Sequence, residues 1–344
     1  MGTINNRLFY AVSAVGFSKD GFNTYTAMHG VQAFSMNTRY NLDAIFELGQ
    51  ISLYDQPEDV PDVEVTLEKV LDGYPPLYSQ ATNGATSPTL AGRSALKFAL
   101  AATFHTDTQN SASGTPITQV VASGLFPSQL GWTFPIQGNF SESMTAIGNN
   151  KVWLQSGFTF TPAFDNLDSP LAGTASGTVN KRQDLITYPG ANGRYTRFPT
   201  DMPGISSSGT NNTDAGGNFT VHVQSIRVQT NLGREPMYEL GRRGFYHRYV
   251  SFPVEVRTDY EFNSTSGDLL NASETATSNV NNQTMSILSR EGTYIDLGSK
   301  NKCTSVSLGG GNASRQGGNV SHTFSYLNYN DLSFFHPADP SSLV

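Results

Sequence analysis

The residue types that commonly do chemistry are present in this sequence, but their spacing matches no catalytic pattern. No HExxH, Walker loop or GxSxG elbow occurs, and the stretch SLGGGNASRQGG lacks the spacing of a dinucleotide-binding turn. His105 and Asp107 could orient each other, but with no nucleophile elbow we interpret them as a surface hydrogen-bonded pair. The histidines are scattered without zinc-ligand spacing: His29, His105, His222, His247, His322 and His336.

The single cysteine, Cys303, falls in a predicted strand, which favours a buried small side chain over a nucleophile. With no second cysteine the chain forms no internal disulfide, and nothing in it requires an oxidising compartment. We therefore predict no catalytic, cofactor-binding or metal-binding residue, no cofactor and no enzyme activity.

Acidic residues could bind calcium or catalyse glycoside hydrolysis. The run Asp55, Glu58, Asp59, Asp62, Glu64 suggests calcium, but it lacks the glycine and terminal glutamate of a hand-type loop, so we interpret it as a solvated loop. Paired carboxylates for glycoside hydrolysis need only meet in space. A carbohydrate-binding or carbohydrate-cleaving β-protein therefore stays open as an alternative, although the only tryptophans, Trp132 and Trp153, sit in no aromatic cluster.

The elements that would position these residues are mostly strands. Apolar and polar residues alternate over residues 252–262, 63–68, 34–36 and 226–228, which is the period of a strand with one buried and one wet face. Residues 117–122 and 303–308 also read as strands, and residues 284–298 as a hairpin that turns near Glu291 and Gly292. A stretch from Ser87 could start a capped helix or run into a strand. The fold class predicted is mainly β, as two sandwich-like or barrel-like domains with one helix each.

An internal repeat organises the chain. VQAFSMNTRYNLDAIFELGQISLY starts at Val31, and VQSIRVQTNLGREPMYELGRRGFY starts 192 residues later at Val223. Eight identities share that offset, among them the three residues of Glu-Leu-Gly that begin at Glu47 and at Glu239. With one residue skipped, Val63-Glu64-Val65 aligns with Val254-Glu255-Val256; later, ITQVVASG from Ile117 resembles CTSVSLGG from Cys303, and GNFS from Gly138 resembles GNVS from Gly318. We infer that one fold occurs twice.

Between the copies the sequence is dense in Gly, Pro, Ser, Thr and Asn, which is typical of linkers and long loops. Its middle, DLITYPGANGRYTRFP, carries aromatic residues that could dock on a surface. The predicted organisation is a first domain over residues 1–165, a linker over 166–217 and a second domain over 218–344.

Composition limits the function classes. Charged residues make up only 14% of the 344 residues, the net charge is −7 and no basic run occurs. Proteins that grip nucleic acid need a basic stripe, so DNA contact would be repulsive or fleeting. No signal peptide is recognisable at the N-terminus, and no stretch reaches the roughly 18 apolar residues of a membrane span. We expect synthesis in a reducing cytosol and no membrane contact.

Residues 29–78, HGVQAFSMNTRYNLDAIFELGQISLYDQPEDVPDVEVTLEKVLDGYPPLY, resemble tail tube subunits of tailed bacteriophages. The phrase REPMYELGRRGFYHRYVSFPVEV in the second copy is similar. The resemblance implies β-sandwich domains flanked by a helix and a long loop, without catalytic residues, in stacked rings through which DNA leaves the capsid. It implies a place in the virion tail, with tape measure, terminator and, in contractile tails, sheath proteins as partners.

Most such tubes have six single-domain subunits per ring, and some resemble them with three subunits that carry the fold twice. The repeat favours trimeric rings with pseudo-sixfold order. Glu64, Glu68, Glu255, Asp259 and Glu261 are the predicted lining of a net negative lumen, with DNA present only in transit. Another virion part, such as a capsid decoration, adaptor or baseplate protein, is the alternative within the same class.

Overall fold

The computed structural model describes residues 7–19, 24–108, 110–162, 178–189, 193–202, 204–212, 221–263, 280–309 and 320–337. In the first part of the chain the strands are β1 (Ser13–Ser18), β2 (Thr26–Ala27), β3 (Val31–Arg39), β4 (Ile45–Phe46), β5 (Leu53–Asp55), β6 (Asp62–Val70), β7 (Phe98–Phe104), β8 (Thr118–Pro135), β9 (Ser141–Gly148) and β10 (Asn150–Leu154). Later come β11 (His222–Asn231), β12 (Arg234–Met237), β13 (His247–Val250), β14 (Glu255–Asn263), β15 (Ser286–Leu288), β16 (Tyr294–Asp296), β17 (Lys302–Gly309), β18 (Ser321–Tyr329) and β19 (Ser333–Phe335). The described helices are α1 (Leu77–Ala81), α2 (Leu90–Arg93) and the 3-10 turns η1 (Tyr10–Val12) and η2 (Arg182–Asp184).

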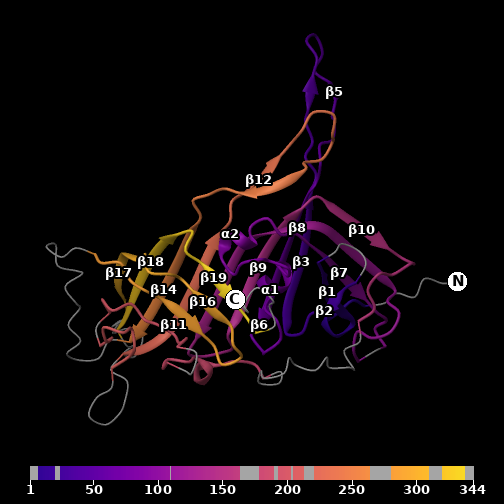
Figure 1. Cartoon of the computed structure of the whole chain (residues 1–344). Coiled ribbons are helices and arrows are strands. Elements are labelled where there is room, and N and C mark those ends of the chain that lie inside the picture. Colours follow the sequence, from indigo (N-terminus) through magenta and orange to yellow (C-terminus); the bar gives the residue numbers. More distant parts are fainter. Residues whose placement is uncertain are drawn as a thin grey trace, which may run out of the picture.

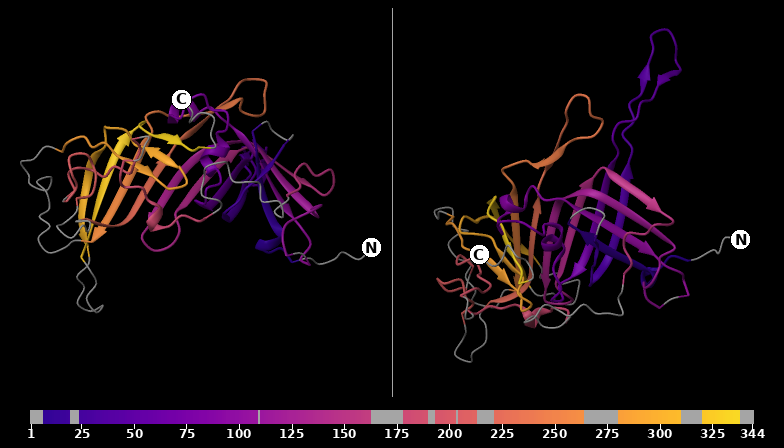
Figure 2. Two further views of the ribbon diagram at one scale, coloured as in Figure 1. Left: turned by 60° about the horizontal axis from the view of Figure 1, so that its bottom comes forward. Right: turned by 45° about the vertical axis from the view of Figure 1, so that its right-hand side comes forward.

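One antiparallel sheet dominates the molecule, which confirms the mainly-β prediction (Figures 1 and 2). Eight of its strands run side by side in the order β3-β6-β9-β8-β11-β14-β18-β17. The central pair, β8 and β11, joins the two regions that carry the sequence repeat. No strand of the described residues covers the outer edge of β3 or of β17.

Strand β8 is long enough to pair with strands of two layers. Its C-terminal part pairs with β9 and β11, and its N-terminal part pairs with β7 and β10. In this second layer β7 pairs with β1, and β1 pairs with β2. The layer packs against the core side of β3, β6 and β9. On the other half, the small sheet β15-β16-β19 covers the core side of β14 and β18.

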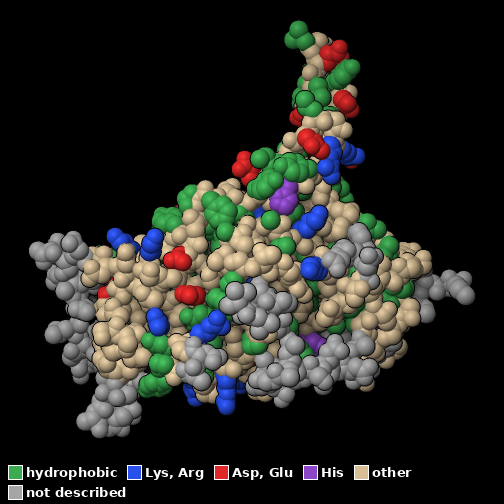
Figure 3. All heavy atoms as spheres, viewed as in Figure 1, with side chains coloured by type: hydrophobic (Ala, Val, Ile, Leu, Met, Phe, Trp, Pro, Cys, Tyr) green, Lys and Arg blue, Asp and Glu red, His purple; other side chains and the backbone are tan. Residues whose placement is uncertain are grey.

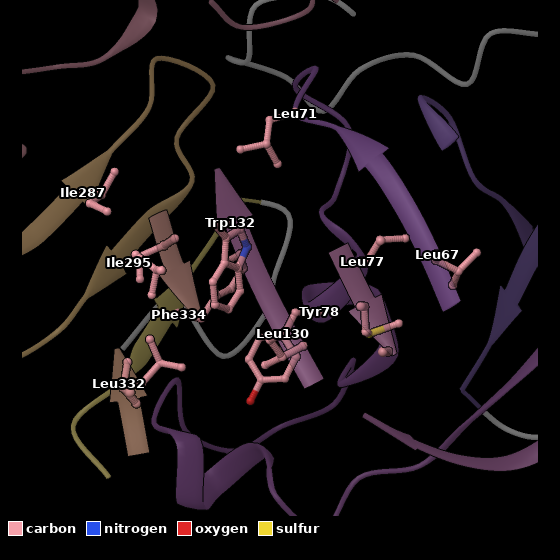
Figure 4. Packing of buried hydrophobic residues seen from close by; sticks show 14 of the residues in the cluster. Leu67, Leu71, Leu77, Tyr78, Leu130, Trp132, Ile287, Ile295, Leu332 and Phe334 are labelled. Carbon is pink, nitrogen blue, oxygen red and sulfur yellow. The ribbon is translucent and has the colours of Figure 1, made fainter. Parts of the chain in front are cut away.

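The predicted alternation decides which residues reach the core. Strand β6 buries Val63, Val65 and Leu67, and β14 buries every second residue from Val256 to Phe262, while their intervening side chains point outward. Figure 4 shows Trp132 of β8 stacked on Phe334 of β19, with ring centroids 5.6 Å apart. One hydrophobic cluster runs beneath both halves of the sheet, and each large side chain buried in it stabilises the fold by roughly 1.5–3 kcal/mol.

A buried carboxylate fixes the start of α1. The Glu142 side chain accepts hydrogen bonds from the backbone N–H of Leu77 (2.5 Å) and Tyr78 (3.1 Å) and from Nε1 of Trp132 (3.2 Å). Burial raises the pKa of Glu142 to about 7, although these donors and the nearby Lys69 favour its charged form. Because its partners come from α1 and β8, Glu142 of β9 ties the short helix to the sheet.

The helix prediction needs a correction. Thr89 caps α2 by accepting from the N–H of Gly92 (3.2 Å), and the chain then enters β7, so both possibilities considered for the stretch from Ser87 are realised in turn. However, both α-helices precede β7, and the only helical segment among the described residues after 177 is the 3-10 turn η2. The expectation of one helix in each half is therefore wrong for the described residues, because β15, β16 and β19 take the covering role there.

The predicted hairpin at residues 284–298 is confirmed as β15 and β16, with Gly292 at the turn at a φ of +102°. The segment between the repeats also has defined structure where it is described. Its Ile186 N–H donates to the carbonyl of Leu288, its Arg197 N–H donates to the carbonyl of Ser286, and Phe198 is buried in the core, so the described residues around Ile186 and Arg197 lie along β15. The domain boundaries at 165 and 217 stay a prediction.

Candidate functional site

The outward face of the eight-stranded sheet is polar, and its rows follow from the strand register. Glu68, Ser143, Gly131, Gln229 and Arg257 stand directly opposite one another on five successive strands. Cross-strand partners share a face, so this row marks one continuous surface, here called the open face. Its concave middle is lined by residues of β8, β9, β11 and β14, and Ser, Thr, Gln and Asn prevail among them.

All five predicted carboxylates lie on the open face, although three strands separate β6 from β14. Glu64, Glu68 and Glu255 are exposed. Asp259 is 3.1 Å from Nε of Arg257 and also accepts from the Ser325 hydroxyl. Sequence reasoning placed these residues on wet strand faces, and the register adds that the two strands share one face.

The open face also carries basic residues, which were not predicted from the sequence. Arg227 stands opposite Asp259 in the ladder, and its place between buried Ile226 and Val228 could have revealed its direction. The described acidic members of the face are Asp62, Glu64, Glu68, Glu255, Asp259 and Glu261, and the basic ones are Arg39, Arg227, Arg257 and Lys302. The excess is therefore two negative charges, which makes the open face only mildly acidic.

The two edge strands leave apolar side chains uncovered on the core side of the sheet. Leu308 of β17 is 63% exposed, and Met36 of β3 is only half-buried. A groove of about 490 Å³ runs along β3 and is lined by residues such as Val15, Met28 and Phe34. Uncovered strand edges of this kind are where sheets accept further strands.

Two hairpins rise from the same end of the sheet (Figures 1 and 2). The first hairpin, residues 40–61, contains β4 and β5, and the second hairpin, residues 232–254, contains β12 and β13. Their tips carry the repeated Glu-Leu-Gly, and Leu48 and Leu240 are fully exposed there. Figure 3 shows hydrophobic side chains gathered along the first hairpin and at the base beside it. Large apolar side chains held in water at a tip are typical of interaction surfaces.

The second hairpin is anchored to the first half of the chain. Arg234 donates to the carbonyls of Pro127 (2.7 Å) and Ser94 (2.5 Å), and burial lowers the pKa of its guanidinium to about 10. Arg248 lies 2.5 Å from Asp62 at the start of β6 and 4.2 Å from the ring of Phe245. These contacts hold the hairpin against β6, β8 and the turn after α2 in the first half of the chain.

The residues considered for catalysis are not brought together. His105 is buried beside Thr103 (3.3 Å), burial lowers its pKa, and Asp107 accepts from the backbone N–H of Arg7. The interpretation of His105 and Asp107 as a surface pair is therefore wrong, because the end of β7 carries the histidine into the interior. Cys303 is partly buried on the core side, opposite Tyr326.

Among the described residues, the tryptophans and the possible metal ligands form no site either. Trp132 is buried, while Trp153 is exposed and stacks on Phe104. Within the described ranges, no three His, Cys, Asp or Glu side chains are grouped so that they could hold a metal ion. No helix in the described part of the chain has the length and apolar character to cross a membrane.

The fold and these surfaces define a mainly-β protein with one continuous antiparallel sheet, two open edges and two exposed hairpins. The sequence matches no protein-family model and no curated protein. Among solved structures it is similar to the anti-feeding prophage cap (AFP tube terminating cap), with 10% identity and a TM-score of 0.33 over 45% of this chain and 95% of that one. It is also similar to a chain of the anti-feeding prophage baseplate, with 9% identity and a TM-score of 0.31 over 44% of this chain and 97% of that one.

Proposed function

We propose that this protein is a structural subunit of a phage-tail-like assembly and, within it, a tail tube subunit. Three copies would close a ring in which the eight-stranded sheets form the wall, and rings would stack through the hairpins. The observation that carries the proposal is the joint between β8 and β11, because it links two similar four-stranded units edge to edge. Among the described strands it leaves open the edges of β3 and β17, which correspond in strand order to the joined edges of β11 and β8.

The similarity of the units rests on strand order and on irregularities in their ladders. The orders β3-β6-β9-β8 and β11-β14-β18-β17 match element by element. The β3 ladder shifts register after Val31 and the β11 ladder shifts after Val223; the β8 ladder shifts after Pro127 and the β17 ladder after Cys303. Bulges are features of a specific strand and sequence, so two coincident pairs favour duplication of one unit.

The ladders support a different alignment from that of the sequence. Val63 stands opposite Thr38 and Val256 stands opposite Thr230, so Val63 corresponds to Val256 rather than Val254. Cys303 corresponds to Pro127 rather than Ile117, because both precede the second bulge. The sequence alignment slipped by two residues at Val63 and by ten at Cys303, because alternating strands tolerate a shift by an even number of residues without changing face.

Head-to-tail contacts close into a ring only when the rotation per unit divides the circle. Two units per chain and three chains would satisfy closure with pseudo-sixfold order. The open face would then line the lumen, where a polar, mildly acidic surface offers DNA phosphates few cations to bind.

A single terminal ring, as in a cap, adaptor or baseplate, is the second candidate, since the open edges serve it equally. The exposed leucines at both hairpin tips favour stacking instead. Electron microscopy of the purified protein tests both: tubes support the tail tube, isolated rings support the terminal ring, and monomers at high concentration contradict both.

A further inference from the structure

The open strand edges carry information about how two copies meet. We infer that β17 of one chain pairs antiparallel with β3 of the next in a register set by the internal joint, with Ser307 opposite Asn37. This inference rests on the proposed function, because it assumes that the contact between chains repeats the contact within the chain.

The internal joint gives the template. In the β8·β11 ladder, Gly131 stands opposite Gln229 and Trp132 opposite Val228. Just beyond the ladder, the N–H of Leu232 donates to the carbonyl of Ser128, the extra residue of the β8 bulge, at 2.7 Å. The bulge therefore fixes the register, since a slip would leave its carbonyl without this donor.

The corresponding bulges transfer the template to the open edges. Thr304 is the extra residue of the β17 bulge, as Ser128 is in β8, and Tyr40 follows β3 as Leu232 follows β11. Placing the Thr304 carbonyl at the N–H of Tyr40 sets Ser307 opposite Asn37. The same register sets Leu308 opposite Met36.

The side chains also match in this register, although the register follows from the bulges alone. Leu308 and Met36 both lie on the core side, in the positions of Trp132 and Val228, which are fully buried in the internal joint. The groove along β3 would receive Leu308. On the open face, polar Ser307 meets polar Asn37. A slip by one residue would set Leu308 against a polar side chain on the opposite face.

One difference predicts that the contact between chains is the weaker of the two. Arg234 clamps the internal joint by donating to the Pro127 carbonyl. Its counterpart in the first repeat, 192 residues earlier, is Leu42, whose side chain carries no hydrogen-bond donor. Rings should therefore come apart at the β17·β3 contact while each chain stays folded.

Disulfide trapping tests the register. In a Cys303→Ser background, Asn37→Cys with Ser307→Cys should link chains on mild oxidation, because directly opposite residues lie roughly 4.5–5.5 Å apart and a disulfide needs about that separation. A closed ring gives a covalent trimer rather than a ladder of longer products. Two matched pairs report registers shifted by two residues in opposite directions: Asn37→Cys with Ser305→Cys, and Asn37→Cys with Gly309→Cys.

The outcomes separate this inference from the proposed function. Rings by electron microscopy with trapping at Asn37 and Ser307 support both. Rings with trapping only in a shifted pair, or in no pair, overturn the register and leave the proposed function standing. Absence of rings and of any trapped product in the unsubstituted protein and in all variants overturns both. If the first pair prevents assembly under reducing conditions, Ser35→Cys with Gly309→Cys tests the same register one row along.

Discussion

Arg248 of the second hairpin lies 2.5 Å from Asp62, a residue 186 positions earlier that starts β6. The arginine is almost fully buried and the aspartate is about half-exposed, so the ion pair fastens the second hairpin to the first half. Arg248 also packs over the Phe245 ring, which adds a cation–π contact.

We expect Arg248→Ala to lower the free energy of unfolding by about 2 kcal/mol, since it removes packing as well as charge. Asp62→Asn should cost less, about 1 kcal/mol, because solvent screens its half-exposed carboxylate. Urea unfolding of single chains would measure both. Equal losses would mean that the ion pair, and not the packing of Arg248, accounts for the effect.

Glu142 should make stability depend on pH. Its folded pKa of about 7 exceeds the unfolded value of 4.5, so the folded protein binds the extra proton between these values. Its contribution is therefore fully present below about pH 4.5 and is lost as pH rises to about 7, a change of about 3 kcal/mol. In Glu142→Gln this part of the slope should disappear, and unfolding measured across the range would reveal it.

The control for Glu142 comes from other buried acids. Burial also raises the pKa of Glu291 and of Asp201, so a smaller slope of the same sign should remain in Glu142→Gln. The amide of glutamine meets the Leu77 N–H as a second donor, which should lower stability by roughly 1–3 kcal/mol at low pH. An unchanged slope would show that Glu142 is already ionised when folded.

The hairpin tips should control stacking but not folding. We expect Leu48→Glu combined with Leu240→Glu to change the free energy of unfolding by less than about 0.5 kcal/mol, because both side chains are fully exposed. Electron microscopy should then show rings without tubes, since charged tips would have to be desolvated on stacking. Leu8→Glu, at an exposed site outside both hairpins, should leave tubes intact. Tubes formed by the double variant would exclude the tips as stacking contacts.

The open face should keep DNA from binding. Changing Glu64, Glu68, Glu255 and Glu261 to Lys turns the small acidic excess into a basic wall. Assembled rings of this variant should bind duplex DNA at low salt and release it as salt rises, whereas unsubstituted rings should not bind. Binding by the unsubstituted protein would argue against a conduit.

Local patterns predicted the strands well and the joint not at all. Alternation identified β6 and β14, because the face on which a side chain lies depends on its neighbours along the strand. The repeated Glu-Leu-Gly was recognised only as part of the repeat, and its place at the two hairpin tips was not predicted. The pairing of β8 with β11 was not predictable in this way. Under the proposed duplication the two units have equivalent edges, so the sequence does not distinguish pairing within a chain from pairing between chains.

Some missed residues did carry a signal. Glu142 lies between Ser141 and Ser143 and in phase with Met144 and Ala146, so alternation directs its carboxylate into the core. Its charge argued against that placement, and the N–H groups of α1 that compensate for burial lie 64 and 65 residues away in sequence. His105 was misplaced because the chain is still buried directly after β7, where the N–H of His105 donates to the carbonyl of Val12.

In the proposed ring, joining two units in one chain through β8 and β11 lowers the reaction order of ring formation. A ring of six separate units requires six bodies to lose independent motion, at an estimated cost of about 4–15 kcal/mol for each association. When three of the joints form during folding, the concentration dependence of ring formation falls from the sixth power to the third. Rings of this protein should therefore nucleate at concentrations where a half-length chain would remain dispersed.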